Sequence, residues 1–101
     1  MSSGYKTGED IKEKLIREFL DSKGVDPIYC GYNYILEIVA LYMETPTIKI
    51  GKVLNEVCRI YNVSNVTVRS NIHNATRSVG YHGYKPIIIE CIKYVKDNSD
   101  L

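Results

Sequence analysis

The most informative hydrophobic pattern lies in residues 53–80. In its second half, apolar residues recur at the spacing of one buried stripe on an α-helix, and they are Val68, Ile72, Ala75 and Val79. This stripe predicts a helix over residues 65–79. An apolar helix over residues 49–60 is predicted directly before it. Between the two, Tyr61-Asn62-Val63 predicts a turn, and Ser64 is the expected N-cap because its hydroxyl can accept from a free first-turn N–H.

The opposite face of the helix predicted over residues 65–79 is polar and lightly basic. At about 100° per residue, this face carries Val66, Thr67, Ser70, His73, Asn74 and Arg77, with Arg69 at its edge. A DNA-binding helix-turn-helix needs this division, because one face packs on the domain while the other enters the major groove. The structural alternative for the same pattern is a solvated helix face without a ligand.

The rest of the chain predicts three further helices and no strand. They are expected over residues 9–23, 27–43 and 86–96. Thr7 is the expected N-cap of the first of these helices, and Gly24 is expected to end it. Pro27 suits the first turn of the second helix, which is apolar on almost every side and therefore belongs in the centre of a bundle. The sequence thus predicts an all-α domain of five or six helices. Residues 1–8 are expected to be a disordered N-terminus or a cloning remnant, and residues 9–101 a single domain.

Charge is distributed unevenly along the chain, although the formal net charge of the 101 residues is only +1. Residues 49–85 hold six Lys and Arg side chains against one acidic residue, Glu56. Residues 1–48 hold five basic and eight acidic side chains. The positive charge therefore lies in the predicted helix-turn-helix, where DNA phosphates would be.

Several classes of function lack support in the sequence. The three cysteines, Cys30, Cys58 and Cys91, are far apart, and neither His73 nor His82 lies at a zinc-ligand spacing from one. We expect buried, reduced thiols, as in a cytosolic protein, and neither a metal nor a cofactor. No catalytic constellation and no glycine-rich phosphate loop can be assembled, which argues against an enzyme. Neither a membrane-length apolar run nor a signal peptide is evident.

The chain resembles a known family in the order and spacing of several short motifs. These are Gly24-Val25, Gly31-Tyr32-x-Tyr34-Ile35-x-Glu37, Tyr61-Asn62, Val68-x-x-x-Ile72-x-x-Ala75, Lys85-Pro86 and Glu90-x-Ile92-x-x-Val95-x-Asp97. They resemble the C-terminal DNA-binding effector domain of the stage-zero sporulation response regulator of spore-forming Firmicutes. The resemblance covers the chain from about residue 16 to its end.

This resemblance implies an all-helical transcription-factor domain that binds a short, A/T-containing promoter element and can sit head to tail on tandem sites. Homodimers or tandem binding on double-stranded DNA are therefore expected, in the cytoplasm at the nucleoid. Family members normally follow a phosphate-accepting receiver domain, for which these 101 residues have no room. The exposed stripe of the recognition helix departs from the family, which is rich in Arg and Glu there, so DNA binding carries over more safely than the target sequence.

Individual roles on the exposed stripe follow from side-chain chemistry. The expected base-reading residues are Val66, Thr67, Ser70 and Asn74, since an amide suits adenine and a methyl group suits thymine. The expected phosphate contacts are Lys49, Lys52, Arg69, His73 and Arg77. The leading hypothesis is sequence-specific DNA binding by a transcriptional regulator. The alternative is a protein-interaction module that pairs with, or titrates, a full-length regulator.

Overall fold

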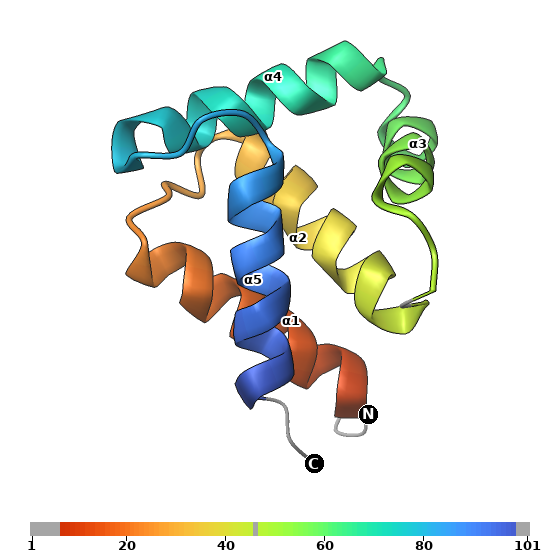
Figure 1. The fold of residues 1–101 in the computed structure, drawn as a ribbon, viewed down its shortest axis with the longest axis vertical. Helices are drawn as coiled ribbons and strands as arrows, with labels where there is room; N and C mark the ends of the chain where they lie inside the picture. Colours follow the sequence, from red (N-terminus) through yellow and green to blue (C-terminus); the bar gives the residue numbers. More distant parts are fainter. Residues whose placement is uncertain (1–6, 46, 99–101) are drawn as a thin grey trace.

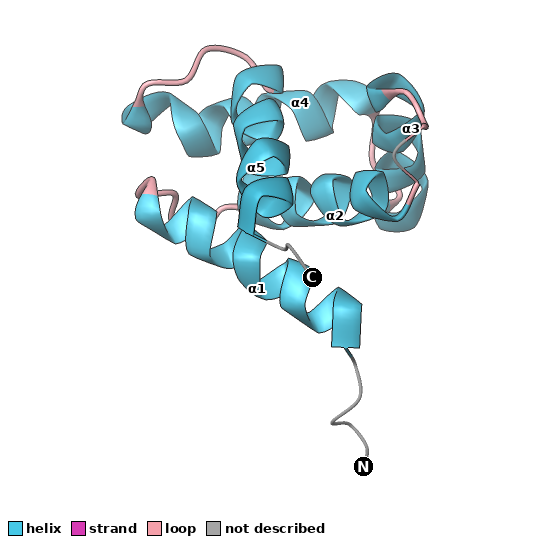
Figure 2. Ribbon diagram, turned by 60° about the horizontal axis from the view of Figure 1, so that its bottom comes forward, coloured by secondary structure: helices cyan, strands magenta, loops and turns pink. Residues whose placement is uncertain are grey.

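The computed structural model describes residues 7–45 and 47–98, most of which lie in helices. They are α1 (Thr7–Ser22), α2 (Cys30–Glu44), α3 (Ile50–Tyr61), α4 (Asn65–Thr76), a 3₁₀ turn η2 (Arg77–Val79) and α5 (Lys85–Asn98). Within these residues there is no strand, so the all-α class is confirmed. Helix α2 lies in the centre and contacts α1, α3, α4 and α5, while α5 also packs on α1 (Figures 1 and 2).

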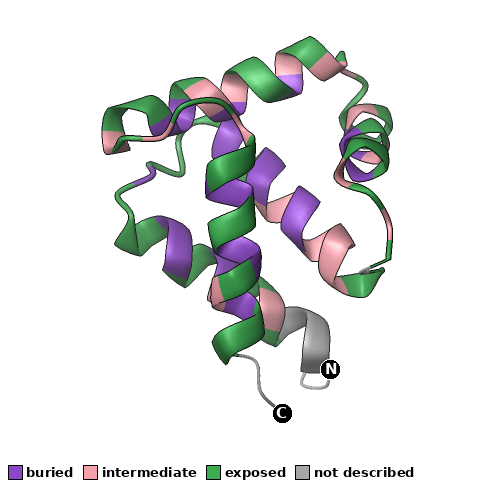
Figure 3. Cartoon of the chain, viewed as in Figure 1, coloured by how far each residue is buried: buried purple, intermediate pink, exposed green. Residues whose placement is uncertain are grey.

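The core is built from one face of every helix, and Figure 3 shows the buried positions turned toward the interior. On α4 the predicted stripe is largely correct, because Val68 and Ile72 are 0% exposed and Ala75 is 2% exposed. The prediction for Val79 is wrong in part. This residue is only half-buried, since α4 ends at Thr76 and the next three residues form η2. The Thr76 hydroxyl donates back to the Ile72 carbonyl at 2.9 Å, which satisfies this buried polar group at the helix end.

Helices α2 and α4 approach each other closely at Gly31. A Cβ atom at this position would lie 2.3 Å from the carbonyl oxygen of Asn71 and 2.9 Å from the Ala75 Cβ. No side chain larger than hydrogen fits there, so Gly31 allows the backbone of α4 to rest directly on α2. This contact positions α4 with its other face turned outward.

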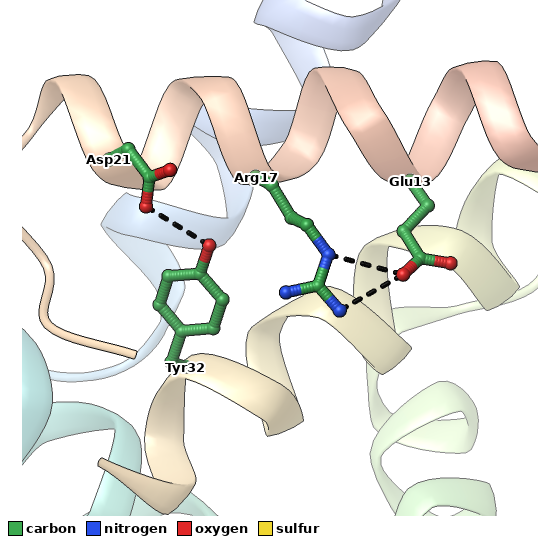
Figure 4. Close-up of polar contacts among 4 residues, drawn as sticks. All are labelled: Glu13, Arg17, Asp21 and Tyr32. Atoms are coloured by element: carbon green, nitrogen blue, oxygen red, sulfur yellow. Dashed lines mark hydrogen bonds and ion pairs between the residues drawn. The ribbon is translucent and has the colours of Figure 1, made fainter. Parts of the chain in front are cut away.

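A polar contact joins α1 to α2 beside the core (Figure 4). The Tyr32 hydroxyl donates to an Asp21 carboxylate oxygen at 3.1 Å, and burial together with this bond raises the pKa of the phenol. Next to it, Arg17 pairs with Glu13 at 2.9 Å on the surface of α1, with its guanidinium 5.9 Å from the centre of the Tyr32 ring. Tyr32 therefore fills the core with its ring and satisfies its polar tip at the edge.

Four predicted helix starts differ from the structure, and the smallest of these differences are one residue, at α3 and at α5, which begins at Lys85 instead of residue 86. Thr7 lies within α1, so its predicted N-cap role is wrong, and residues 7 and 8 of the predicted N-terminal segment are helical. The other residues of that predicted end, 1–6, lie outside the described part of the chain. Pro27 does not open α2, because the Asp26 carboxylate accepts from the Ile28 N–H at 3.0 Å and holds a separate turn. Helix α2 begins at Cys30, and α3 begins one residue after Lys49.

The final helix confirms the preference for helix over strand in the run Ile87-Ile88-Ile89. The first two of these residues are buried against the core, whereas Ile89 is 58% exposed, as a helical repeat requires. Cys91 on the same face is fully buried, and burial raises the pKa of its thiol to about 12.

The three cysteines are free, but they are not all buried. Cys30 is exposed because it starts α2 at the surface, so the prediction of a buried thiol is wrong there. Cys58 is half-buried. Among the residues described, no group of three His, Cys, Asp or Glu side chains is arranged to hold a metal ion. None of the helices described combines the length and the apolar character that crossing a membrane would need.

Candidate nucleic-acid interface

A tight connection of three residues joins α3 to α4. Helix α3 ends at Asn62, which adopts a left-handed conformation at φ 56°, and the Val63 N–H donates to the Cys58 carbonyl at 3.0 Å. Asn is one of the few residues that tolerate this conformation. The Ser64 hydroxyl then accepts from the Thr67 N–H at 3.1 Å, which confirms Ser64 as the N-cap of α4. The two helices consequently cross at a steep angle (Figure 1).

The outer face of α4 is accessible along its length (Figure 3). Val66 is 64% exposed at the beginning of the helix. Ser70 and Asn74 are exposed farther along it, while Thr67 and His73 are half-buried. The four predicted base-reading residues thus lie on one helix, but they differ in how much of each side chain is available.

Hydrogen bonds within α4 decide which polar side chains are free for a ligand. The Thr67 hydroxyl lies 2.9 Å from the Ser64 hydroxyl and takes part in the N-cap. Ser70 makes only a long bond, 3.4 Å, to the Thr67 carbonyl, and Asn71 donates to that same carbonyl at 2.7 Å. Asn74 makes no hydrogen bond through its side chain within the described residues. Among the three polar residues predicted to read bases, Asn74 is therefore the one whose side chain has no internal hydrogen bond, whereas the Thr67 hydroxyl is engaged in the N-cap.

The cations on and beside α4 differ in whether they have an acidic partner among the described residues. Arg59 on α3 is paired with Glu56, whereas Lys49, Lys52, Arg69 and Arg77 form no ion pair within the described part of the chain. Lys49, Lys52 and Arg69 line one open hollow between α3 and the start of α4. Arg77 lies apart from them in η2, beyond the C-terminal end of α4. The structure therefore brings three of the five predicted phosphate contacts together.

The connection between η2 and α5 contributes residues that the sequence analysis did not select. It runs back beside α4 before α5 begins (Figure 1). The Gly83 N–H donates to Nδ1 of His73 at 3.0 Å, which ties the connection to α4. Tyr84 lines the hollow that holds Lys49, Lys52 and Arg69. It also lines a second one with Val66, Ser70 and His73. In the sequence, the only signals for a connection of this kind are Gly80, Gly83 and the Tyr84-Lys85 pair.

No protein-family model, no curated protein and no solved structure matches this chain.

Proposed function

We propose that the chain is a sequence-specific double-stranded DNA-binding transcriptional regulator in which α3, the 62–64 turn and α4 act as a helix-turn-helix. One observation carries this proposal. The exposed face of α4 is polar, and at its N-terminal end gather three cations that have no acidic partner among the described residues, Lys49, Lys52 and Arg69. Such cations can exchange their counterions for DNA phosphates, which favours association.

Helix α4 has dimensions that suit a recognition helix. Its 12 residues span about 18 Å, and the B-DNA major groove, about 12 Å wide, admits an α-helix. In this arrangement the Asn74 amide bonds an adenine edge, Val66 contacts a thymine methyl group, and Ser70 lies between them. Arg69 and the two lysines of α3 hold the phosphates beside the groove, and Arg77 does so at the far end of α4.

The resemblance to sporulation regulators adds a context to this proposal. A regulator of this kind acts in the cytoplasm at the nucleoid, and copies of the chain bind tandem promoter sites or associate as homodimers. The altered stripe on α4 gives it a target different from that of the family. Gly31, which the resemblance includes, supports a shared scaffold because it sets the close contact between α2 and α4.

The first test is a fluorescence-anisotropy titration of mixed-sequence duplexes at low and at physiological salt. We expect measurable binding at low salt and a steep loss as salt rises, because each phosphate contact releases counterions. With few cations available, non-specific binding should be weak, with a Kd on the order of 10⁻⁴–10⁻⁶ M at physiological salt. Absence of binding at low salt contradicts the proposal.

A second test separates base reading from phosphate contacts once a preferred site has been selected from a random pool. Asn74→Ala should cost about 1–3 kcal/mol on that site and far less on random DNA. Arg77→Ala should weaken binding to all duplexes and lower the salt slope by about one. Asn33→Ala and Lys93→Ala, at exposed positions of α2 and α5, serve as matched controls that leave binding unchanged. If both α4-side variants bind like the parent, α4 is not the recognition helix.

The second candidate function is a protein-interaction module that pairs with, or titrates, a full-length regulator. It is favoured by exposed apolar residues near the α3–α4 turn, where Ile60 is 47%, Tyr61 41% and Val66 64% exposed. Co-purification with a full-length regulator, together with no DNA binding at low salt, supports this candidate.

A further inference from the structure

We infer that the 80–84 connection is a third element of the DNA interface, in which Tyr84 contacts a backbone phosphate and His73 positions the connection. This inference rests on the proposed function and extends it to residues outside the helix-turn-helix. It starts from the location of Tyr84, which lines both hollows together with Arg69. One hollow opens toward the lysines of α3, and the other toward the outer face of α4.

The Tyr84 side chain is suited to bind a phosphate. Tyr84 is half-buried against the core, which limits its freedom. Its hydroxyl makes no hydrogen bond within the described residues, so it is free to donate to an anion. The residues that share its first hollow supply three cations and no carboxylate. A phosphate oxygen that reaches this hollow meets positive charge and a neutral O–H donor together.

The 80–84 connection is held by hydrogen bonds at two points, so the position of Tyr84 is fixed before DNA binds. At one end, the Tyr81 hydroxyl donates to Glu90 of α5 at 2.6 Å, and burial together with this bond raises the pKa of the phenol to about 12. At the other end, Gly83 donates its N–H to His73. Gly83 adopts φ +80°, a conformation that other residues rarely take, which aims this N–H at α4.

The bond from Gly83 also defines what His73 can do. A ring nitrogen that accepts a hydrogen bond carries no proton, so the neutral imidazole keeps its proton on Nε2. His73 therefore positions the connection through Nδ1 and retains Nε2–H as its remaining donor. The sequence predicts a direct phosphate contact for His73, and the bond to Gly83 gives it a positioning role as well.

The experiment measures binding of the full chain to a fluorescent mixed-sequence duplex at several salt concentrations. Tyr84→Phe, which removes only the hydroxyl, should weaken binding about tenfold while the salt slope stays unchanged, because no cation is lost. Arg69→Ala should weaken binding and lower the slope by about one. The matched control is Tyr42→Phe, at a half-buried tyrosine of α2 whose ring lies 5.8 Å from the Lys96 ammonium, and it should bind like the parent.

The positioning role of His73 is tested with His73→Phe, which removes the acceptor. Amide hydrogen exchange at Gly83, measured by NMR without DNA, should accelerate at least tenfold as the protecting bond is lost. In a double-mutant cycle, the loss from Tyr84→Phe should shrink in the His73→Phe background, because the hydroxyl is no longer held in place. A thermal melt of each variant checks that the fold is retained.

The outcomes distinguish this inference from the function on which it rests. If the parent binds the duplex and Tyr84→Phe binds it with equal affinity, the inference is overturned and the proposed function stays intact. Unchanged exchange at Gly83 in His73→Phe, or fully additive losses in the cycle, overturns the positioning role. No binding by the parent at low salt overturns both the inference and the proposed function.

Discussion

Gly31→Ala is expected to lower the free energy of unfolding by about 3 kcal/mol, the upper end of the usual cost of overpacking. The new methyl carbon would lie 2.3 Å from the Asn71 carbonyl oxygen, well inside contact distance. This oxygen belongs to the backbone of α4, so it cannot rotate away as a flexible side chain would. Relief requires α2 and α4 to separate, and other core contacts between them loosen as a consequence. Urea denaturation of the two proteins measures the difference.

Gly51→Ala is the matched control for this prediction. Gly51 also lies in a helix, but a Cβ atom there meets nothing within 4 Å. Alanine should therefore stabilise the protein by up to about 1 kcal/mol, since glycine loses more backbone entropy in a helix. Equal stability of Gly31→Ala and the parent would mean that α4 does not rest on α2 in this way.

The fold could be predicted from the sequence where the decisive interactions are local. The stripe Val68, Ile72 and Ala75 repeats at helical spacing, and the Ser64 cap bonds a residue only three positions away. The buried Ile87 and Ile88 likewise follow from spacing within α5. Local signals fail to predict a helix start where a side chain bonds the backbone instead. The Asp26 carboxylate accepts from the Ile28 N–H, and α2 therefore begins only at Cys30.

The candidate site could be predicted only in outline. The polar face of α4 follows from the helical spacing of its residues. The contact between the Thr67 and Ser64 hydroxyls depends on their side-chain conformations, which residue spacing does not predict. The hydrogen bond from Gly83 to His73 joins residues ten positions apart, across a turn whose direction is set by tertiary packing. For the same reason, the sequence does not distinguish Tyr84 from other loop residues, because its position beside Arg69 depends on tertiary packing.

Ile72→Ala should cost about 2–5 kcal/mol of stability, the range observed when a large buried aliphatic side chain is truncated. Ile72 is 0% exposed on the inner face of α4, so its truncation removes buried apolar surface. It also leaves a cavity, which the packing of α4 on α2 prevents from closing fully. The change in the urea midpoint, at constant slope, measures this cost.

Ile89→Ala supplies the contrast for Ile72→Ala, because this isoleucine of α5 is 58% exposed and should change stability by no more than about 0.5 kcal/mol. Similar small losses for both variants would contradict the burial of the α4 stripe. That burial also matters for the proposed function. Asn74 and Ser70 face outward only because Ile72 and its neighbours hold the opposite side of α4 in the core, so the loss of this anchor should weaken DNA binding as α4 loosens.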